Sequence, residues 1–196
     1  RERPYGRGVA VAGPRPCREG SSVLLRALIW DVDGTVAETE RDGHRVAFNR
    51  AFEDAGIAWR WDVPTYGALL HVTGGLERLL YCMEGRADAP ATAHEREALA
   101  RELHRRKNAV YAELVAQGGI DARPGVCRLM EACWREGVAL AVATTTSTSN
   151  VDALFSSLFG AGWRSRFAAV VCAEDAPVKK PDPQAYRLVL ERLQLR

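Results

Sequence analysis

The sequence has no long hydrophobic run, no closely spaced cysteine pair and almost no excess of one charge sign. Its longest apolar stretch, residues 167–173, is far shorter than the ~20 residues that a membrane-spanning helix needs. None of the five cysteines forms a C-x-x-C pair, so we expect neither a metal-binding cysteine cluster nor a disulfide framework. The 27 Lys and Arg residues nearly balance the 25 Asp and Glu residues. These features give no reason to expect nucleic acid or a membrane as a partner, and they are compatible with an anionic small molecule.

The composition is that of a chain that buries a hydrophobic core. Apolar residues make up 47% of the 196 residues, which suits one domain or one domain with a sizeable insertion. Residues 1–21 are rich in Arg, Gly and Pro, lack the apolar segment of a secretory signal, and are expected to form a disordered extension. Because the cysteines are interpreted as reduced thiols, we expect a cytoplasmic protein.

Three short apolar runs, at residues 23–30, 138–143 and 167–172, predict buried strands. Apolar residues at helical spacing predict helices between and after them, over 44–55, 64–71, 76–83, 91–117, 126–136, 151–159 and 184–196. Strands that alternate with helices favour a parallel α/β sheet covered on both faces. The helices between residues 38 and 118 are expected to form an inserted lid. The charged residues of 91–117, Lys107 among them, predict a solvated face held by i,i+4 ion pairs.

A polar cluster follows each predicted strand. The clusters are Asp31 with Asp33, the threonines at 144–146, and Lys179 with Lys180. Each has a simple interpretation alone, as a turn, a helix N-cap or an exposed loop. Their order at three strand ends is more specific, because ligands of parallel sheets bind outside the carboxyl ends of the strands.

The residue types at these strand ends suit phosphoryl transfer. Asp31 and Asp33 are alternate residues, so on an extended strand both carboxylates point to one face and need a cation or a shared proton. Mg²⁺ prefers such oxygen ligands, and a carboxylate can also attack phosphorus. Thr144 offers hydrogen-bond donors to phosphate oxygens, and Lys180 offers a positive charge.

The motifs D-V-D-G-T (residues 31–35), A-V-A-T (141–144) and K-P-D-P (180–183) resemble the first three motifs of the haloacid dehalogenase (HAD) superfamily. Residues 38–52 and 72–78, together with A-T-T-T-S at 143–147, are similar to its CbbY branch, phosphatases of xylulose-1,5-bisphosphate. The resemblance covers most of residues 27–193. It implies a HAD-like Rossmannoid parallel sheet over 22–37 and 119–196, with an inserted α-helical cap over 38–118.

The resemblance also implies a Mg²⁺-dependent phosphatase of a small phosphorylated sugar. Asp31 would be the nucleophile and a metal ligand, Asp33 the general acid/base that also gives its backbone carbonyl to the metal, and Thr144 and Lys180 would hold the transferring phosphate. The hinges of the cap would lie at Thr39 and at 118–124. The implied substrate-binding residues are Gly34, Thr35, Glu38, His44, Thr73, Gly74, Gly75, Arg78, Thr145, Thr146 and Asn150, with Thr146 and Asn150 facing a distal phosphate.

Two departures from the family pattern stand out. Leu76 occupies the place of an expected Lys, and losing one charge-assisted hydrogen bond to a distal phosphate costs roughly 1.5–3 kcal/mol unless Arg78 or another base substitutes. The fourth, acidic motif of the family would lie beyond Arg196, so the core is expected to be C-terminally truncated. A chain ending there is expected to place the strand before Asp31 at a sheet edge, to be poorly stable and to be nearly inactive.

Two alternatives to a phosphatase stay open. A β-phosphoglucomutase-like phosphomutase uses the same core residues and differs in whether water or a sugar hydroxyl reaches the phospho-aspartate. The other alternative is an inactive fragment or binding module. A dehalogenase is disfavoured because that chemistry does not need Asp33. We expect a monomer that binds neither nucleic acid nor a membrane.

Overall fold

The computed structural model describes residues 24–196, and the predicted N-terminal extension lies outside them. Three strands, seven α-helices and two short helical turns follow one another in an alternating order. In chain order they are β1 (Ala27–Trp30), η1 (Glu40–His44, a π-helical turn), α1 (Arg45–Asp54), α2 (Val63–Leu69), α3 (Gly75–Glu84), α4 (Ala93–Ala116), α5 (Val126–Arg135), β2 (Ala139–Ala143), α6 (Thr148–Phe159), η2 (Trp163–Arg166, a 3₁₀ turn), β3 (Ala169–Val171) and α7 (Gln184–Arg192).

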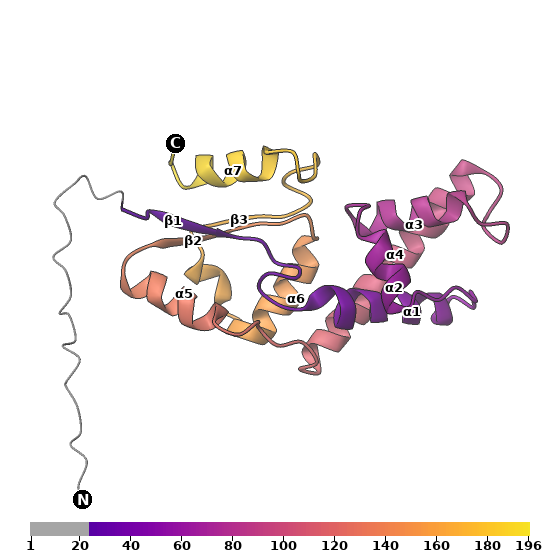
Figure 1. The fold of residues 1–196 in the computed structure, drawn as a ribbon, viewed down its shortest axis with the longest axis horizontal. Helices are drawn as coiled ribbons and strands as arrows, with labels where there is room; N and C mark the ends of the chain where they lie inside the picture. The colour runs from indigo at the N-terminus through magenta and orange to yellow at the C-terminus, as the bar shows by residue number, and fades with distance from the viewer. Residues whose placement is uncertain (1–23) are drawn as a thin grey trace, which may run out of the picture.

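The strands form a parallel sheet in the order β1-β2-β3. Ala27 lies opposite Ala139, and Ala141 lies opposite Ala169. Helix α7 covers one face of the sheet, and α5 and α6 cover the other (Figure 1). We call this unit the sheet lobe. Its architecture confirms the predicted α/β fold, and β1 pairs on one side only among the described strands, as expected.

Alternate residues of β2 belong to different cores. Leu140 and Val142 join the large apolar cluster on the side of α5 and α6, whereas Ala141 and Ala143 join the smaller cluster beneath α7. A strand buried on both faces has no polar positions, which explains the continuous apolar run of this segment. The alternation also fixes the register, since a slip of one residue would exchange the two faces.

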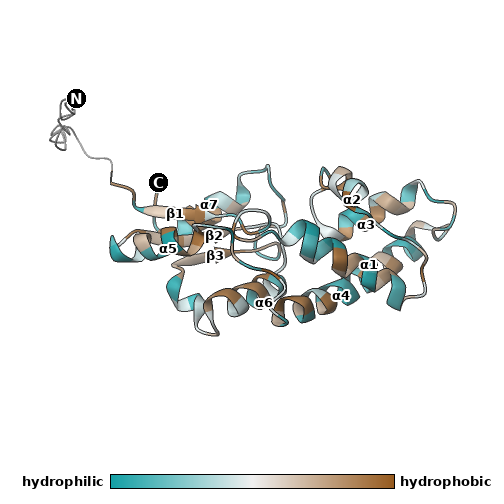
Figure 2. Cartoon of the chain, turned by 60° about the horizontal axis from the view of Figure 1, so that its bottom comes forward, coloured by the Kyte–Doolittle hydropathy of each residue, from teal (hydrophilic) through white to brown (hydrophobic). Residues whose placement is uncertain are grey.

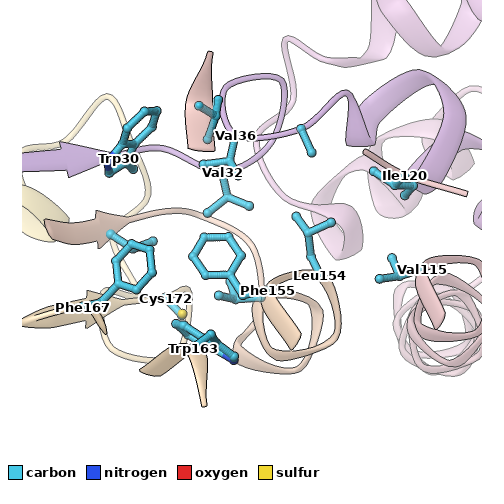
Figure 3. Close-up of a cluster of buried hydrophobic side chains, with 14 of the residues drawn as sticks. Trp30, Val32, Val36, Val115, Ile120, Leu154, Phe155, Trp163, Phe167 and Cys172 are labelled. Atoms are coloured by element: carbon cyan, nitrogen blue, oxygen red, sulfur yellow. The ribbon is translucent and has the colours of Figure 1, made fainter. Parts of the chain in front are cut away.

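An aromatic group fills the large cluster. The Phe155 ring lies 4.8 Å from the Trp163 ring and 5.3 Å from the Phe167 ring, measured between centroids. All three side chains are buried (Figure 3). This packing holds α6 against the residues that precede β3. It therefore sets the position of α6 relative to the sheet.

Helices α1–α4 form a second unit, the helical lobe, beside the sheet lobe (Figures 1 and 2). Its own apolar cluster centres on Trp61, whose ring lies 4.8 Å from Phe48 and 5.0 Å from Phe52. Helix α4 belongs to both lobes. Leu103 packs in the helical lobe, while Tyr111, two turns later, packs in the large cluster of the sheet lobe. The two lobes are therefore joined by one continuous helix.

Helix α4 begins at a capping box between Thr92 and Glu95. Its outer face carries the expected ion pairs, including Arg101 with Glu97. The prediction that Lys107 shares this solvated face is wrong: Lys107 is 3% exposed, because its position falls on the apolar stripe of the helix. None of the helices in residues 24–196, including this one, combines the length and hydrophobicity needed to cross a bilayer.

Truncating Phe155 to Ala is expected to lower the free energy of unfolding by about 3–5 kcal/mol, because the lost ring leaves a cavity between Trp163 and Phe167. Equilibrium urea unfolding measures the change. Leu129→Ala, on a side chain that is 48% exposed, serves as the control and should change stability by less than about 0.5 kcal/mol. A loss below about 1 kcal/mol for Phe155→Ala would show that this aromatic group does not hold the sheet lobe together.

Candidate active site

A cavity of about 700 Å³ lies where the carboxyl ends of the strands meet the helical lobe. Both lobes contribute to its wall, because residues after β1, β2 and β3 face residues from α3 and α4. The predicted site residues that line it are Asp31, Asp33, Gly34, Glu38, His44, Thr73, Gly74, Gly75, Arg78, Thr145, Thr146, Asn150 and Lys180. The structure therefore brings together residues that are up to 149 positions apart in the chain.

An ion pair connects the end of β1 with the loop after β3. Lys180 Nζ donates to Asp31 Oδ1 at 2.7 Å and to the backbone oxygen of Ala143, the last residue of β2, at 3.1 Å. The Lys180 ammonium thus joins three strand ends. The Asp31 side chain stays 38% exposed toward the cavity, whereas that of Lys180 is 18% exposed. A partly open carboxylate beside a fixed cation is suited to approach by an anionic substrate.

Asp33 has partners of its own on the first turn of the helical lobe. Its Oδ1 accepts hydrogen bonds from Thr39 Oγ1 at 2.5 Å and from His44 Nε2 at 3.0 Å. Burial by itself would raise the pKa of the Asp33 carboxyl. The charge of His44, these two hydrogen bonds and the more distant Lys107 outweigh burial and lower that pKa to about 2. Asp33 is therefore ionised in the free protein at neutral pH.

A tight turn follows the two aspartates at the end of β1. Gly34 adopts φ = 70°, a conformation that favours glycine, and its N–H donates to the Ala37 oxygen at 2.9 Å. Thr35 lies at the exposed tip of this turn and does not line the cavity, although it was predicted among the substrate-binding residues. The Thr35 N–H donates to the Val32 oxygen at 3.1 Å, so Thr35 is part of the turn itself.

Thr144 also lies outside the cavity lining. It is 1% exposed, its hydroxyl accepts from the Thr146 N–H at 3.2 Å, and its own N–H donates to the Val171 oxygen at 3.0 Å. Thr144 therefore shapes the turn that presents Thr145 and Thr146 to the cavity. In the same region Glu174 accepts from the N–H and the hydroxyl of Thr148 at the start of α6, at 3.0 and 2.8 Å.

The two connections between the lobes are tied together beside the site. Arg123 donates to the Gly34 oxygen at 2.6 Å and pairs with Glu38 at 2.6 Å. An antiparallel bridge joins Ala37 with Ala122. The segments predicted as hinges are thus adjacent, and Arg123 links both to the aspartate turn.

The first turn of α3 meets the sheet lobe through an ion pair. Glu77, in the first turn of α3, binds Lys179 across the cavity. Gly74 has φ = 101°, a conformation that other residues rarely adopt, so this position favours glycine. Arg78 is 6% exposed and donates to Tyr66 Oη at 2.9 Å and to two backbone oxygens. These bonds fix the segment that ends at Val72.

Sequence reasoning missed several residues of the cavity wall. They are Glu40, Phe48, Leu70, Glu77, His104, Lys107, Ser147, Ala173 and Glu174; the wall also includes Lys179 and Leu76, which the sequence analysis had singled out. One signal was available for Lys107, because positions 100, 103, 107, 110 and 111 follow the helical spacing of the buried residues of α4. Burial lowers the pKa of the Lys107 ammonium to about 8, against the opposing charges of Asp33 and Glu40.

The residues present fit a hard cation that shares its coordination with a substrate. No group of three or more His, Cys, Asp or Glu side chains in residues 24–196 has the arrangement of a complete metal site. Asp31 and Asp33 nevertheless line one cavity wall, and Mg²⁺ is commonly held by one or two carboxylates plus substrate phosphate. The Asp31 carboxylate and an oxygen of Asp33 are thus the candidate ligands.

Replacing His104 with Gln is expected to flatten the pH dependence of stability. Burial and the nearby Lys107 lower the pKa of His104 from 6.5 to about 4. The neutral ring stabilises the fold fully above pH 6.5, and this contribution is lost as the pH falls toward 4. Between pH 7 and pH 5 the loss is about 2 kcal/mol. Urea unfolding at both pH values should show it in the parent and not in His104→Gln. His94→Gln, on the exposed start of α4, should retain the parent's dependence, and an unchanged dependence in His104→Gln would refute the assignment.

Comparisons with known proteins show which family the chain belongs to. A family model described as haloacid dehalogenase-like hydrolase matches residues 25–196. The plasmid CbbY protein of Cupriavidus necator is 44% identical over 171 residues, 87% of this chain and 67% of that protein. The CbbY protein of Cereibacter sphaeroides is 40% identical over 170 residues, 87% of this chain and 71% of that protein.

Solved structures that resemble this chain also include CbbY proteins. The crystal structure of CbbY from Rhodobacter sphaeroides in complex with phosphate has a TM-score of 0.79 and 39% identity, covering 88% of this chain and 74% of that one. A mutant of the same protein in complex with xylulose-1,5-bisphosphate also has a TM-score of 0.79, with 38% identity and the same coverage. The predictions of the HAD fold and of a hydrolase are confirmed, and the chain belongs to the haloacid dehalogenase-like hydrolase family, with CbbY proteins among its relatives.

Proposed function

We propose that the protein is a Mg²⁺-dependent phosphatase of a small sugar phosphate that acts through an aspartyl-phosphate on Asp31. The observation that carries the proposal is the Lys180–Asp31 ion pair at the open edge of the sheet. It holds one oxygen of a partly exposed carboxylate in place and puts a cation where a phosphoryl group would approach. Family membership supports the hydrolytic chemistry.

In the first step, an Asp31 carboxylate oxygen attacks phosphorus and the bond from phosphorus to the sugar oxygen breaks. The leaving oxygen takes a proton from Asp33. Asp33 is ionised in the free protein, so it first takes up a proton from the phosphate monoanion of the substrate or from solvent; the incoming phosphate raises its proton affinity by like-charge repulsion. In the second step Asp33 accepts a proton from the water that attacks the phospho-aspartate, which releases inorganic phosphate and restores Asp31.

Mg²⁺ would be held by the Asp31 carboxylate and the Asp33 backbone oxygen. When bound, it neutralises part of the negative charge that the carboxylates and the phosphate bring together. Lys180 adds a second positive charge from the β3 loop. Thr39 and His44 hold the Asp33 carboxylate in one orientation during the proton transfers.

The cavity supports a small phosphorylated sugar as substrate. Its wall mixes charged, amide and hydroxyl groups, and it is closed on one side by residues 38–118, which we propose act as the cap. The relative from Rhodobacter sphaeroides, solved with xylulose-1,5-bisphosphate, makes that sugar bisphosphate the first substrate to test. A phosphomutase would use the same residues of the sheet lobe and differ in the acceptor of the phosphoryl group.

Asp31→Asn is expected to lower kcat for p-nitrophenyl phosphate by at least about a thousandfold, because the amide cannot attack phosphorus. Asp152→Asn removes a carboxylate from an exposed ion pair with Arg164 and is the matched control; it should retain the parent rate. Steady-state kinetics at saturating Mg²⁺ measure both. An Asp31→Asn protein with the parent rate would exclude Asp31 as the nucleophile.

Phosphate release from xylulose-1,5-bisphosphate is expected to require Mg²⁺, to stop on addition of EDTA and to return when Mg²⁺ is restored. Glucose 1-phosphate should not be isomerised, because a phosphatase passes the phosphoryl group to water. A phosphate assay and a coupled glucose 6-phosphate assay follow the two reactions. Isomerisation of glucose 1-phosphate without phosphate release would show that the protein is a phosphomutase and not a phosphatase.

A further inference from the structure

Lys107 is a buried cation in the wall of the cavity. It lies on α4 and is 3% exposed. Its Nζ lies 5.3 Å from the centre of the Phe48 ring and 5.2 Å from that of Tyr111. Its hydrogen bond is to an amide, Asn108 Oδ1, at 3.3 Å. Burying an ammonium costs free energy unless an anion compensates, so its place here calls for an explanation.

The other cations that line the cavity have partners. Lys180 binds Asp31, Lys179 binds Glu77, and Arg78 donates to three oxygens of the helical lobe. Within residues 24–196, Lys107 forms no ion pair. It is therefore a cavity cation that no carboxylate contacts directly, since Asp33 and Glu40 act on it only from a distance.

A chain of polar groups connects Lys107 with the sheet lobe. Asn108 Oδ1 accepts from Lys107 Nζ and from Asn150 Nδ2, each at 3.3 Å. Asn150 Nδ2 also donates to Thr146 Oγ1 at 3.3 Å. All these bonds are long, so they exchange readily for stronger bonds to an anion. Lys107, Asn150 and Thr146 together line the cavity where α4 packs against α6.

We propose that Lys107 binds a second anionic group of the substrate, the second phosphate of a sugar bisphosphate, and supplies the positive charge that Leu76 lacks. This inference rests on the proposed function. The reacting phosphate belongs at Asp31 and Lys180, on the sheet lobe. Lys107 enters the cavity from the helical lobe, and Asn150 and Thr146 provide neutral donors beside it. The cost of a buried charge is then offset when the substrate binds.

The test measures binding without turnover, in an Asp31→Asn background. Calorimetry gives the Kd of xylulose-1,5-bisphosphate and of xylulose 5-phosphate. Adding Lys107→Met, which keeps the length of the side chain but removes its charge, should weaken the bisphosphate about 10- to 100-fold more than the monophosphate. Arg105→Met is the control, since it removes a charge from the exposed face of α4; it should leave both constants within about twofold.

Two further measurements separate a binding role from a structural one. Lys107→Met should unfold at the same or a higher temperature, because it replaces a buried charge by an apolar side chain. Adding Leu76→Lys to that variant should restore a large part of the lost bisphosphate affinity. Should Lys107→Met not fold, Leu76→Lys alone should tighten bisphosphate binding more than monophosphate binding.

The proposal is overturned if Lys107→Met weakens the binding of both ligands equally, or if Arg105→Met weakens binding as much as Lys107→Met does. It is also overturned if Leu76→Lys restores no bisphosphate affinity, or if neither ligand binds. Turnover of p-nitrophenyl phosphate by the parent is measured separately. Its absence would count against the phosphatase, whereas a parent that hydrolyses this monoester but does not prefer the bisphosphate would count against Lys107 alone.

Discussion

The site depends on separate partners for two aspartates that follow one strand. Asp31 and Asp33 are separated by a single residue, and their repulsion would be costly without separate compensation. The fold provides it from two directions. Lys180 reaches Asp31 from the loop after β3, and Thr39 and His44 reach Asp33 from the first turn of the helical lobe. Both sets of contacts join segments that are brought together only in the folded protein: the Lys180 contact needs the parallel sheet, and the Thr39 and His44 contacts need the packing of the two lobes.

The position of the helical lobe is set by α4. This helix packs in both apolar clusters, so its buried stripe decides which side chains of the lobe reach the cavity. Arg123 ties the two connecting segments to the turn after Asp33, and Glu77 meets Lys179 across the cavity. Because of these contacts, the shape of the cavity depends on where the helical lobe lies. A displacement of the helical lobe would therefore act on the partners of Asp33 as well as on the substrate.

The sequence alone predicted the strands, the order of the motifs and the convergence of Asp31, Asp33 and Lys180, because apolar runs and strand-end polar clusters are local signals. It did not place Thr35 and Thr144 outside the cavity, since the direction of a turn depends on hydrogen bonds such as that between Thr144 and Thr146. Lys107 was predicted on the solvated face because its neighbours are charged, yet tertiary packing on both sides of α4 buries it. Pairs such as Glu77 with Lys179 join residues 102 positions apart and leave no trace in local spacing.

A phosphoryl mimic can show whether Asp31 is the attacking group and whether Lys180 lies beside the phosphoryl group that it receives. Beryllium fluoride with Mg²⁺ binds an aspartate nucleophile as a stable adduct that ¹⁹F NMR and crystallography detect. One adduct is expected on the Asp31 carboxylate, with Lys180 Nζ within hydrogen-bonding distance of it, and none is expected in Asp31→Asn. An adduct on Asp33, or none in a protein that hydrolyses phosphate esters, would contradict this expectation.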